Sequence, residues 1–259
     1  MISSLSLTPV AHSGQPSMRQ IPLDLGPVSV PGLEEFIEGD NHELLAWLKA
    51  WPAVERLGTP VYLWGPKGAG KTHLLRAMIE RALQAGFGVI WLNAQTCQMW
   101  DAPDLGAPTL ALIDECEQLD VNHQHLAFNL FIESAAGAAA LAGGERVDAS
   151  VGPLYIIAAG ATPAIDLAVR DDLRTRLGWG LTFVLHTLPE DGLKAALTHE
   201  AARRGMTLGD ELLSYLLTRY SRDLGFLMNL LDRLDRYALA EQRMLTVPLL
   251  KQMLASETA

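Results

Sequence analysis

The sequence predicts an α/β domain with a parallel sheet flanked by helices, followed by a small all-helical domain. Short apolar, β-prone runs alternate with helical patterns up to about residue 190. Such alternation is typical of strand–helix–strand units, whose strands run parallel and are covered on both faces. Beyond residue 190 no strand pattern recurs, and apolar residues follow helical spacing. We therefore expect an α/β domain over residues 33–188 and a helical domain over residues 189–256.

The first helix of the α/β domain is expected to begin at Asp40 or Asn41, which are both favourable N-cap residues. Leucines and tryptophans then recur at helical spacing up to Trp51, a pattern that favours core packing over base stacking. The apolar run over residues 61–64 predicts the first strand. Apolar residues at helical spacing predict a helix from residue 73 onward.

Four further strands are expected. The run over residues 110–115 is apolar until its last two positions, as in a strand buried on both faces. An apolar helix is predicted over residues 126–136, and the small residues of 137–150 favour an extended, mobile connection. A polar segment with two arginines occupies residues 171–177. The other three strands are predicted over residues 89–93, 154–159 and 181–185.

The helical domain contains four segments with helical periodicity and no strand signal. Thr246 is a suitable N-cap for the last helix, and Pro248 falls in its first turn, where proline is tolerated. The four helices are predicted over residues 191–204, 210–220, 223–241 and 247–254. The junction between the two domains is a natural position for a nucleotide.

Composition limits the classes of function. The chain has 259 residues, of which 49% are hydrophobic, enough for a full core. No apolar run reaches the roughly 18 residues of a membrane span, so we expect no membrane association. The net charge of −10 argues against strong direct DNA binding through phosphates. Cys97 and Cys116 match neither a metal motif nor a disulfide framework, and we expect core residues in a reducing cytoplasm.

One stretch fits the G-x-x-x-x-G-K-T phosphate-binding pattern at every position, between a predicted strand and a predicted helix. Its glycines let successive backbone N–H groups point into one hollow, above the positive end of the following helix. A glycine-rich turn without a ligand is the alternative, which the flanking strand and helix disfavour. The loop residues are Gly65, Pro66, Lys67, Gly68, Ala69, Gly70, Lys71 and Thr72.

Two carboxylates, Asp114 and Glu115, stand at the carboxyl end of the predicted third strand. In open parallel sheets this edge carries the ligand. Lys71 can reach the β- and γ-phosphates, and Thr72 and Asp114 can hold Mg²⁺. Glu115 is placed to orient or polarise an attacking water. The alternative for the pair is a solvated strand end.

The N-terminal region does not follow the globular pattern. Residues 1–19 are rich in small and polar residues, without periodicity, and we expect them to be disordered. The apolar hexamer at residues 20–25 then has two interpretations. From the residues alone, a strand or staple onto the core is favoured over a linear peptide for a partner's groove.

Several segments together resemble the AAA+ ATPases, within the branch of the bacterial replication initiator DnaA and the shorter Hda proteins. The segments that carry the resemblance are residues 36–41, 63–72, 112–115, 174–180, 231–236 and 245–248. The resemblance implies an AAA+ P-loop NTPase domain followed by a helical lid domain, with ADP or ATP and Mg²⁺ as cofactors. It places Phe36 and Ile37 near the adenine and adds His73 and Arg222 to the nucleotide-binding residues.

Two observations favour the Hda-like members of that branch over DnaA. The sequence has no helix-turn-helix domain after the predicted lid, and its acidic balance agrees. Hda proteins also carry an N-terminal peptide that binds the β sliding clamp of DNA polymerase III, and residues 20–25 are similar to it. This resemblance reverses the preference for a core strand. The clamp-binding residues implied are Gln20, Ile21, Leu23 and Leu25.

The resemblance also implies a mechanism and an arginine that performs it. An Hda-like protein, bound to nucleotide and to the DNA-loaded clamp, docks on ATP-bound DnaA and promotes hydrolysis there. Arg176 matches the arginine finger of the family's box VII, which stabilises charge on the transferring phosphoryl group. Arg174 is the weaker candidate for that role. The alternative for Arg176 is a surface ion pair within the chain.

Two positions depart from the family's pattern. The sensor I position falls at Ala161, beside Thr162, and the sensor II arginine is replaced by Gly225. Arg222 could substitute only if the helix began differently. We therefore expect a nucleotide-binding protein with weak intrinsic hydrolysis. The resemblance to AAA+ proteins, which often pack in rows or rings, also implies nucleotide-dependent self-association. A self-acting AAA+ ATPase, such as a helicase-loader-like motor, and a DNA-binding initiator variant are the rival functions.

Overall fold

The computed structural model describes residues 32–52, 59–96, 108–142, 152–220 and 223–257. These ranges exclude the segment expected to be disordered, the hexamer at residues 20–25 that is expected to bind the clamp, Cys97 and Arg222.

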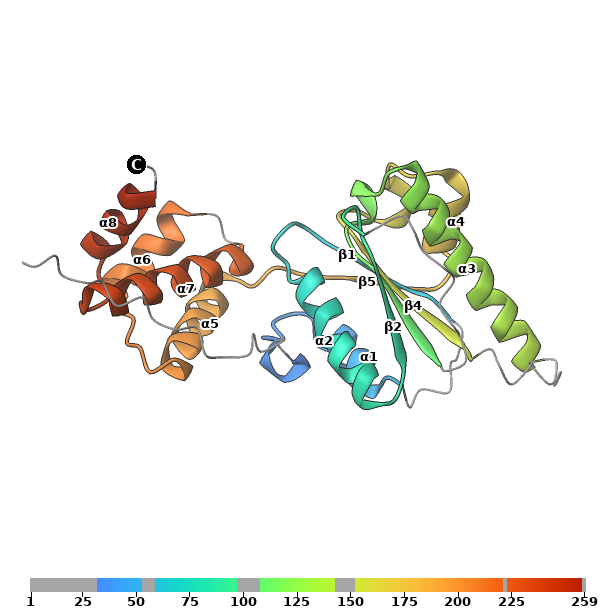
Figure 1. Cartoon of the computed structure of the whole chain (residues 1–259), viewed down its shortest axis with the longest axis horizontal. Coiled ribbons are helices and arrows are strands. Elements are labelled where there is room, and N and C mark those ends of the chain that lie inside the picture. Colours follow the sequence, from blue (N-terminus) through green and yellow to red (C-terminus); the bar gives the residue numbers. More distant parts are fainter. Residues whose placement is uncertain (1–31, 53–58, 97–107, 143–151, 221–222, 258–259) are drawn as a thin grey trace, which may run out of the picture.

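The α/β part is built on a five-stranded parallel sheet in the order β2-β3-β4-β1-β5 (Figure 1). The phosphate loop follows β1, which lies between β4 and the edge strand β5, so the loop emerges one strand in from that edge. The strand order places β4 between β1 and β3. The strands are β1 (Val61–Trp64), β2 (Gly88–Leu92), β3 (Thr109–Ile113), β4 (Leu154–Gly160) and β5 (Leu181–Val184).

Helices cover both faces of the sheet, as the sequence predicts. Alternate side chains of β3 face opposite layers: Leu110 and Leu112 pack with α1 (His42–Ala50) and α2 (Lys71–Gln84). Ala111 and Ile113 pack with the second layer, formed by two other helices. These are α3 (Val121–Ala142) and α4 (Asp171–Leu177), with short helical turns η1 (Leu33–Glu35), η2 (Cys116–Gln118) and η3 (Ala164–Asp166) completing the domain.

Four helices after the sheet form a second core of their own. Leu197, Leu216, Leu234 and Leu250 are almost completely buried in it. Figure 1 shows these helices grouped at one end of the molecule, reached through the segment that follows β5. They are α5 (Glu190–Arg203), α6 (Asp210–Arg219), α7 (Leu224–Glu241) and α8 (Val247–Glu257). The expected cap of α8 is present, since the Leu249 N–H donates to Thr246 Oγ1 at 3.4 Å.

Some sequence-based expectations need correction. The helix predicted to end at residue 136 continues as α3 to Ala142, so the first part of the expected extended connection is helical. Alanine has the highest helix propensity, and the run after Gly137 outweighs the roughly 1 kcal/mol cost of one glycine. Residues 143–150 lie outside the described ranges. β3 ends at Ile113, so Asp114 and Glu115 follow the strand instead of ending it.

Asn41 stands at the N-cap position of α1, but its side chain does not cap the helix. Asn41 Nδ2 donates to the His186 carbonyl at 3.1 Å, and the His186 N–H donates to Asn41 Oδ1 at 2.8 Å. This pair ties the segment before α1 to the segment after β5. The helix therefore begins at His42 without a side-chain cap, and Asn41 instead fixes the junction between the two domains.

The remaining packing expectations are met among the described residues. Trp51 is buried, with its ring 4.9 Å from that of Phe87, and half-buried Trp47 packs against Phe183. Cys116 is fully buried, as expected for a small core residue. None of the described helices is both long and apolar enough to cross a bilayer.

Candidate nucleotide-binding site

The phosphate loop requires glycine at two positions for both backbone and packing reasons. Gly68 and Gly70 have φ values of +80° and +100°, in the left-handed region that side chains disfavour. A Cβ at Gly70 would lie 2.7 Å from a ring carbon of Phe36. A Cβ at Gly68 would lie 2.8 Å from the Cα of Asp223. The loop is therefore enclosed between Phe36 on one side and the start of α7 on the other.

Lys71 is folded into its own loop. Its Nζ donates to the Gly65 carbonyl at 2.6 Å and to the Pro66 carbonyl at 3.0 Å. Burial lowers the pKa of Lys71, and nearby carboxylates oppose that shift. Those carboxylates come from η2, the end of β3 and the lid: Glu117, Asp114, Glu115 and Asp223. Lys71 is thus a positive charge with several carboxylates nearby, in position to meet an anion such as a phosphate.

Thr72 and Asp114 lie together although they are far apart in the sequence. Thr72 Oγ1 donates to Asp114 Oδ2 at 2.7 Å, and Asp114 is only 3% exposed. Burial raises the pKa of Asp114 even though Thr72 and the Glu115 N–H donate hydrogen bonds to it. A hydroxyl and a carboxylate oxygen side by side suit Mg²⁺, which takes its other ligands from phosphates and water. No group of three His, Cys, Asp or Glu side chains suited to a metal occurs among the described residues.

Glu115 adopts an unusual backbone conformation. Its φ is +49°, and strained residues of this kind cluster at functional sites. Its Oε1 accepts a hydrogen bond from Gln118 Nε2 at 3.0 Å, which ties the side chain to η2. Glu115 therefore follows the strand directly, next to Asp114, and its carboxylate belongs to the group that surrounds Lys71.

Glu117 was missed by the sequence reasoning. Its Oε2 accepts a hydrogen bond from the N–H of Ala161 at 3.1 Å, which connects η2 to the end of β4. It is also the foremost charged neighbour of Lys71. The only sequence signal was its position two residues after Glu115. Ala161 brings no polar side chain to this edge, and Thr162 takes part through its carbonyl, which accepts from the Tyr62 hydroxyl at 2.7 Å.

The lid contributes a carboxylate to the phosphate loop. Asp223 caps α7, since its Oδ1 accepts from the Phe226 N–H at 3.0 Å, and it lies against Gly68. The sequence reasoning took Asp223 as the start of a helix and not as a site residue. α7 begins at Leu224, so Gly225 lies in its first turn and no arginine stands there. The residue that could have replaced it, Arg222, lies outside the described ranges.

Phe36 and His73 lie together beside the loop, with ring centroids 5.6 Å apart. Ile37 is half-buried next to Phe36 in the chain. A Cβ at Gly39 would lie 3.0 Å from the Leu188 side chain, so the segment before α1 also reaches the start of the lid. The structure thus brings the expected nucleotide-binding segments together at the junction of the two domains.

The two arginines of α4 have different environments. Arg174 donates to the carbonyls of Leu167 (Nε, 3.0 Å) and Val169 (Nη2, 2.8 Å) and pairs with Asp171 at 2.8 Å. Half-buried Arg176 makes no hydrogen bond or ion pair with any residue that the structure describes. Its guanidinium carbon lies 5.1 Å from the ring centroid of Trp179. The alternative of a surface ion pair for Arg176 is not observed.

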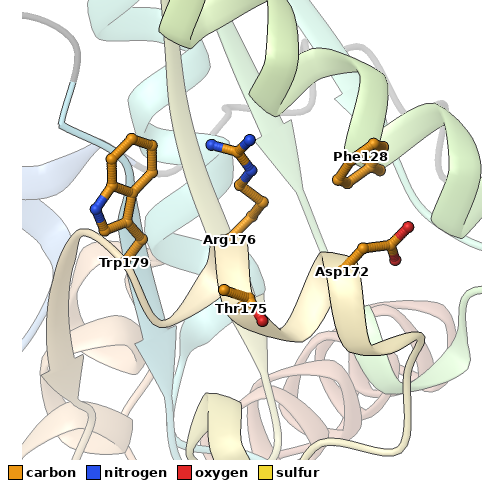
Figure 2. A pocket seen from close by; sticks show the side chains of 5 residues that line it. All are labelled: Phe128, Asp172, Thr175, Arg176 and Trp179. Atoms are coloured by element: carbon orange, nitrogen blue, oxygen red, sulfur yellow. The ribbon is translucent and has the colours of Figure 1, made fainter.

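Arg176 does not belong to the group of charged residues around Lys71. It belongs to the α3–α4 layer, on the opposite face of the sheet from α2, which begins at Lys71. It instead borders a surface hollow of about 420 Å³, shown in Figure 2. The lining residues are Phe128, Asp172, Thr175, Arg176 and Trp179.

Comparison with known families and proteins adds evidence from sequence. Residues 190–254 match the model of the family described as "Hda, lid domain". The chain is 32% identical over 241 residues to a Haemophilus influenzae protein described as uncharacterized. That match covers 91% of this chain and 98% of the relative, so the two belong to one family.

Solved structures share the fold. Domain III of the Thermotoga maritima initiator DnaA is similar with a TM-score of 0.62 and 18% identity, covering 87% of this chain and 95% of that one. AMPPCP-bound DnaA from Aquifex aeolicus has a TM-score of 0.58 and 22% identity, over 79% and 64% of the respective chains. The Thermotoga maritima branch migration motor RuvB reaches 0.60 at 18% identity, over 87% and 71%. The chain therefore shares its fold with DnaA and RuvB, and its helical domain matches the lid domain of the Hda family.

Proposed function

We propose that this chain is a negative regulator of replication initiation, which acts with the DNA-loaded β sliding clamp to stimulate hydrolysis of ATP bound to DnaA. The observation that carries the proposal is the environment of Arg176. Its charge is neutralised by no described carboxylate, and it stands at a surface hollow away from the chain's own phosphate loop. An arginine so placed is available to a nucleotide held by another subunit.

The proposed role of Arg176 follows from the negative charge of the phosphoryl group during its transfer. Negative charge is spread over the equatorial oxygens of the transferring group, and a guanidinium supplied by a neighbour stabilises it. A guanidinium that is not already paired loses no ion pair when it moves to that phosphate. Arg174 is a poor candidate because moving its guanidinium would break its bond to the Leu167 carbonyl and remove the side-chain donor of the Val169 carbonyl.

The chain's own nucleotide, ADP or ATP with Mg²⁺, is proposed to act as a docking switch. The glycine turn, Lys71 and the Thr72–Asp114 pair support nucleotide binding, and a DnaA of similar fold has been solved with AMPPCP. Weak intrinsic hydrolysis is supported by Ala161 and Gly225, which bring no polar group to the two sensor positions. The carboxylate of Asp223 against Gly68 further disfavours added phosphate charge.

Residues 20–25 are proposed to bind the β clamp. Gln20 would hydrogen-bond in a polar pocket, while Ile21, Leu23 and Leu25 would supply apolar anchors. The support for this step is the resemblance of the hexamer to clamp-binding peptides together with the match of the lid domain to the Hda family.

The decisive experiment measures ATP hydrolysis on DnaA that has been preloaded with labelled ATP, in the presence of DNA-loaded clamp and this chain. We expect stimulation by the wild-type chain and a loss of about 1000-fold with Arg176→Ala, the scale of an arginine finger. Arg219→Ala, at an exposed helix end, is the control that removes an equal charge. Equal stimulation by wild type and Arg176→Ala would refute the proposal.

A second experiment tests the clamp separately. Clamp capture by immobilised chain is expected to fail with Gln20→Ala combined with Leu23→Ala. Gln15→Ala, in the same N-terminal region, is the matched control. Full capture by the double variant would show that the hexamer is not the clamp ligand.

A self-acting ATPase remains the second candidate because Lys71, the Thr72–Asp114 pair and Glu115 are all in place at one edge of the sheet. In that case the chain alone would hydrolyse ATP at about 1 s⁻¹ or faster, as typical enzymes do. Glu115→Gln would abolish that turnover. A turnover far below this value, together with stimulation of DnaA, would exclude the second candidate.

A further inference from the structure

We propose that Trp179 is a positioning residue for Arg176: its ring holds the guanidinium at the surface, charged and unpaired, until a partner's phosphate takes it. The proposal rests on the proposed function, because it assigns a task to Arg176 in a partner's active site. Trp179 itself is not proposed to touch the nucleotide.

The contact between the two side chains has the geometry of a cation–π interaction. The guanidinium carbon lies 5.1 Å from the Trp179 ring centroid, and tryptophan is the strongest aromatic partner within about 6 Å. Trp179 is 65% exposed, which is unusual for so large an apolar side chain. In Figure 2 the guanidinium lies between the Trp179 ring and Phe128. An aromatic face orients the cation without neutralising its charge.

The carboxylate best placed to neutralise Arg176 is occupied elsewhere. Asp172 precedes Arg176 by four residues on α4, a spacing that ordinarily favours an ion pair. Its Oδ2 instead pairs with Arg170 Nη2 at 2.6 Å, and its Oδ1 accepts the Leu173 N–H at 2.7 Å. Figure 2 shows the Asp172 carboxylate directed away from Arg176. Arg176 therefore contacts the Trp179 ring instead of this carboxylate.

The backbone turn after α4 fixes the ring in this position. The helix ends at Leu177, the Gly178 N–H donates to the Arg174 carbonyl at 3.1 Å, and the Trp179 N–H donates to the Arg176 carbonyl at 3.2 Å. These bonds bring residue 179 back beside residue 176. The hollow between Trp179 and Phe128 leaves the guanidinium accessible from outside.

The kinetic test uses Trp179→Leu, which keeps apolar bulk without the ring, and Trp179→Phe, which keeps an aromatic face. In the clamp-dependent DnaA assay, Trp179→Leu should lower the maximal stimulated rate about two- to fivefold, the scale of an exposed cation–π contact. The concentration for half-maximal stimulation should not change, and Trp179→Phe should recover most of the rate. In an Arg176→Ala background, Trp179→Leu should cause no further loss. A raised half-saturating concentration with an unchanged maximal rate would overturn the proposal, because the ring would then be a contact for the partner.

A second measurement does not depend on DnaA. In ¹⁵N-arginine-labelled full-length chain, the Nε–Hε group of Arg176 should be more ordered than that of exposed Arg219 and less than that of triply bonded Arg174. Trp179→Leu should reduce its order to the Arg219 level. Mobility of Arg176 equal to Arg219 in the wild type would refute the positioning, even if DnaA were stimulated. An ordered Arg176 without any stimulation would refute the proposed function and leave the positioning intact.

Discussion

The ion pair between Arg170 and Asp172, with Nη2 and Oδ2 2.6 Å apart, determines which residue Arg176 meets. Both side chains are about one-third exposed, so the pair adds little to stability. Its effect is electrostatic: it engages the one carboxylate four residues before Arg176. Three residues therefore keep the proposed arginine finger, Arg176, in place and unpaired. Arg170 pairs with Asp172, and the ring of Trp179 contacts Arg176.

Removing Arg170 should weaken the proposed activity. In Arg170→Ala, the Asp172 carboxylate is released and pairs with Arg176 at the favoured spacing, so the maximal stimulated rate on DnaA should fall several-fold. Adding Asp172→Asn should restore the rate, because asparagine still accepts the Leu173 N–H but carries no charge. Steady-state assays of both variants check this. An Arg170→Ala rate equal to wild type would show that Asp172 does not compete for Arg176.

Substitutions of Arg174 and Arg176 should affect the stability of the chain to different extents. Arg174→Ala removes the side-chain donor of the Val169 carbonyl and one of the two donors to the Leu167 carbonyl, and should lower the free energy of unfolding by about 1–3 kcal/mol. Arg176→Ala removes only the contact with the Trp179 ring and should lower it by no more than about 0.5–1 kcal/mol. Urea unfolding, followed by circular dichroism, compares the two variants. Equal destabilisation by both would contradict the different environments described for them.

Lys71→Ala should abolish stabilisation by nucleotide. A nucleotide present at 100 times its Kd adds about 2.7 kcal/mol to the folded state, which thermal unfolding detects as a raised Tm. The variant should fold without nucleotide but show no such rise, whereas Lys49→Ala, at an exposed position of α1, should respond as wild type. A full Tm rise in Lys71→Ala would mean that nucleotide binds elsewhere.

The affinity for Mg²⁺ in the presence of nucleotide should depend on pH through Asp114. Burial raises the pKa of Asp114 above its ordinary 3.8, so without metal the carboxyl takes up a proton at a higher pH than usual. Mg²⁺ binds the charged form, and its affinity should therefore weaken as pH falls through that raised pKa. The raised pKa also means that the charged Asp114 carboxylate lowers the free energy of unfolding of the metal-free chain at pH values above that pKa. This destabilisation decreases as the pH falls below it. Titrations of Mg²⁺ across pH, with Asp114→Asn as a variant whose affinity is low and flat, check the direction.

Asp223→Asn should shift nucleotide preference towards the triphosphate. Asparagine is an equally good helix cap, so α7 should be preserved while the negative charge beside Gly68 is removed. Repulsion is greater for the more highly charged ligand, so the affinity for ATP should rise more than that for ADP. Calorimetric titration of both nucleotides measures the ratio. An unchanged ratio would show that Asp223 does not face the phosphates.

The sheet and the phosphate loop could be predicted because their signals are local. Strands buried on both faces are continuous apolar runs, and β1 was predicted with the bounds that the structure has. The loop's conformation depends on Gly70, which the motif prescribes, and on Gly68, which stands at one of its variable positions. Predictions failed where local rules compete. The alanine-rich end of α3 has a composition that suits both a helix and a flexible connection, and helix propensity prevails there as far as Ala142.

The sequence by itself determined an α/β fold with a phosphate loop and a helical lid, because periodicity and turn chemistry act over a few residues. Only the tertiary structure decided the partners of the charged side chains. It brings Glu117 to the N–H of Ala161, Asp223 to the loop at Gly68, and Trp179 to Arg176, while Arg174 is held by backbone carbonyls. The physical reason is that a charged side chain interacts with the groups that the strand order and the helix ends bring within about 3–5 Å of it. The spacing of residues along the chain does not specify those distances.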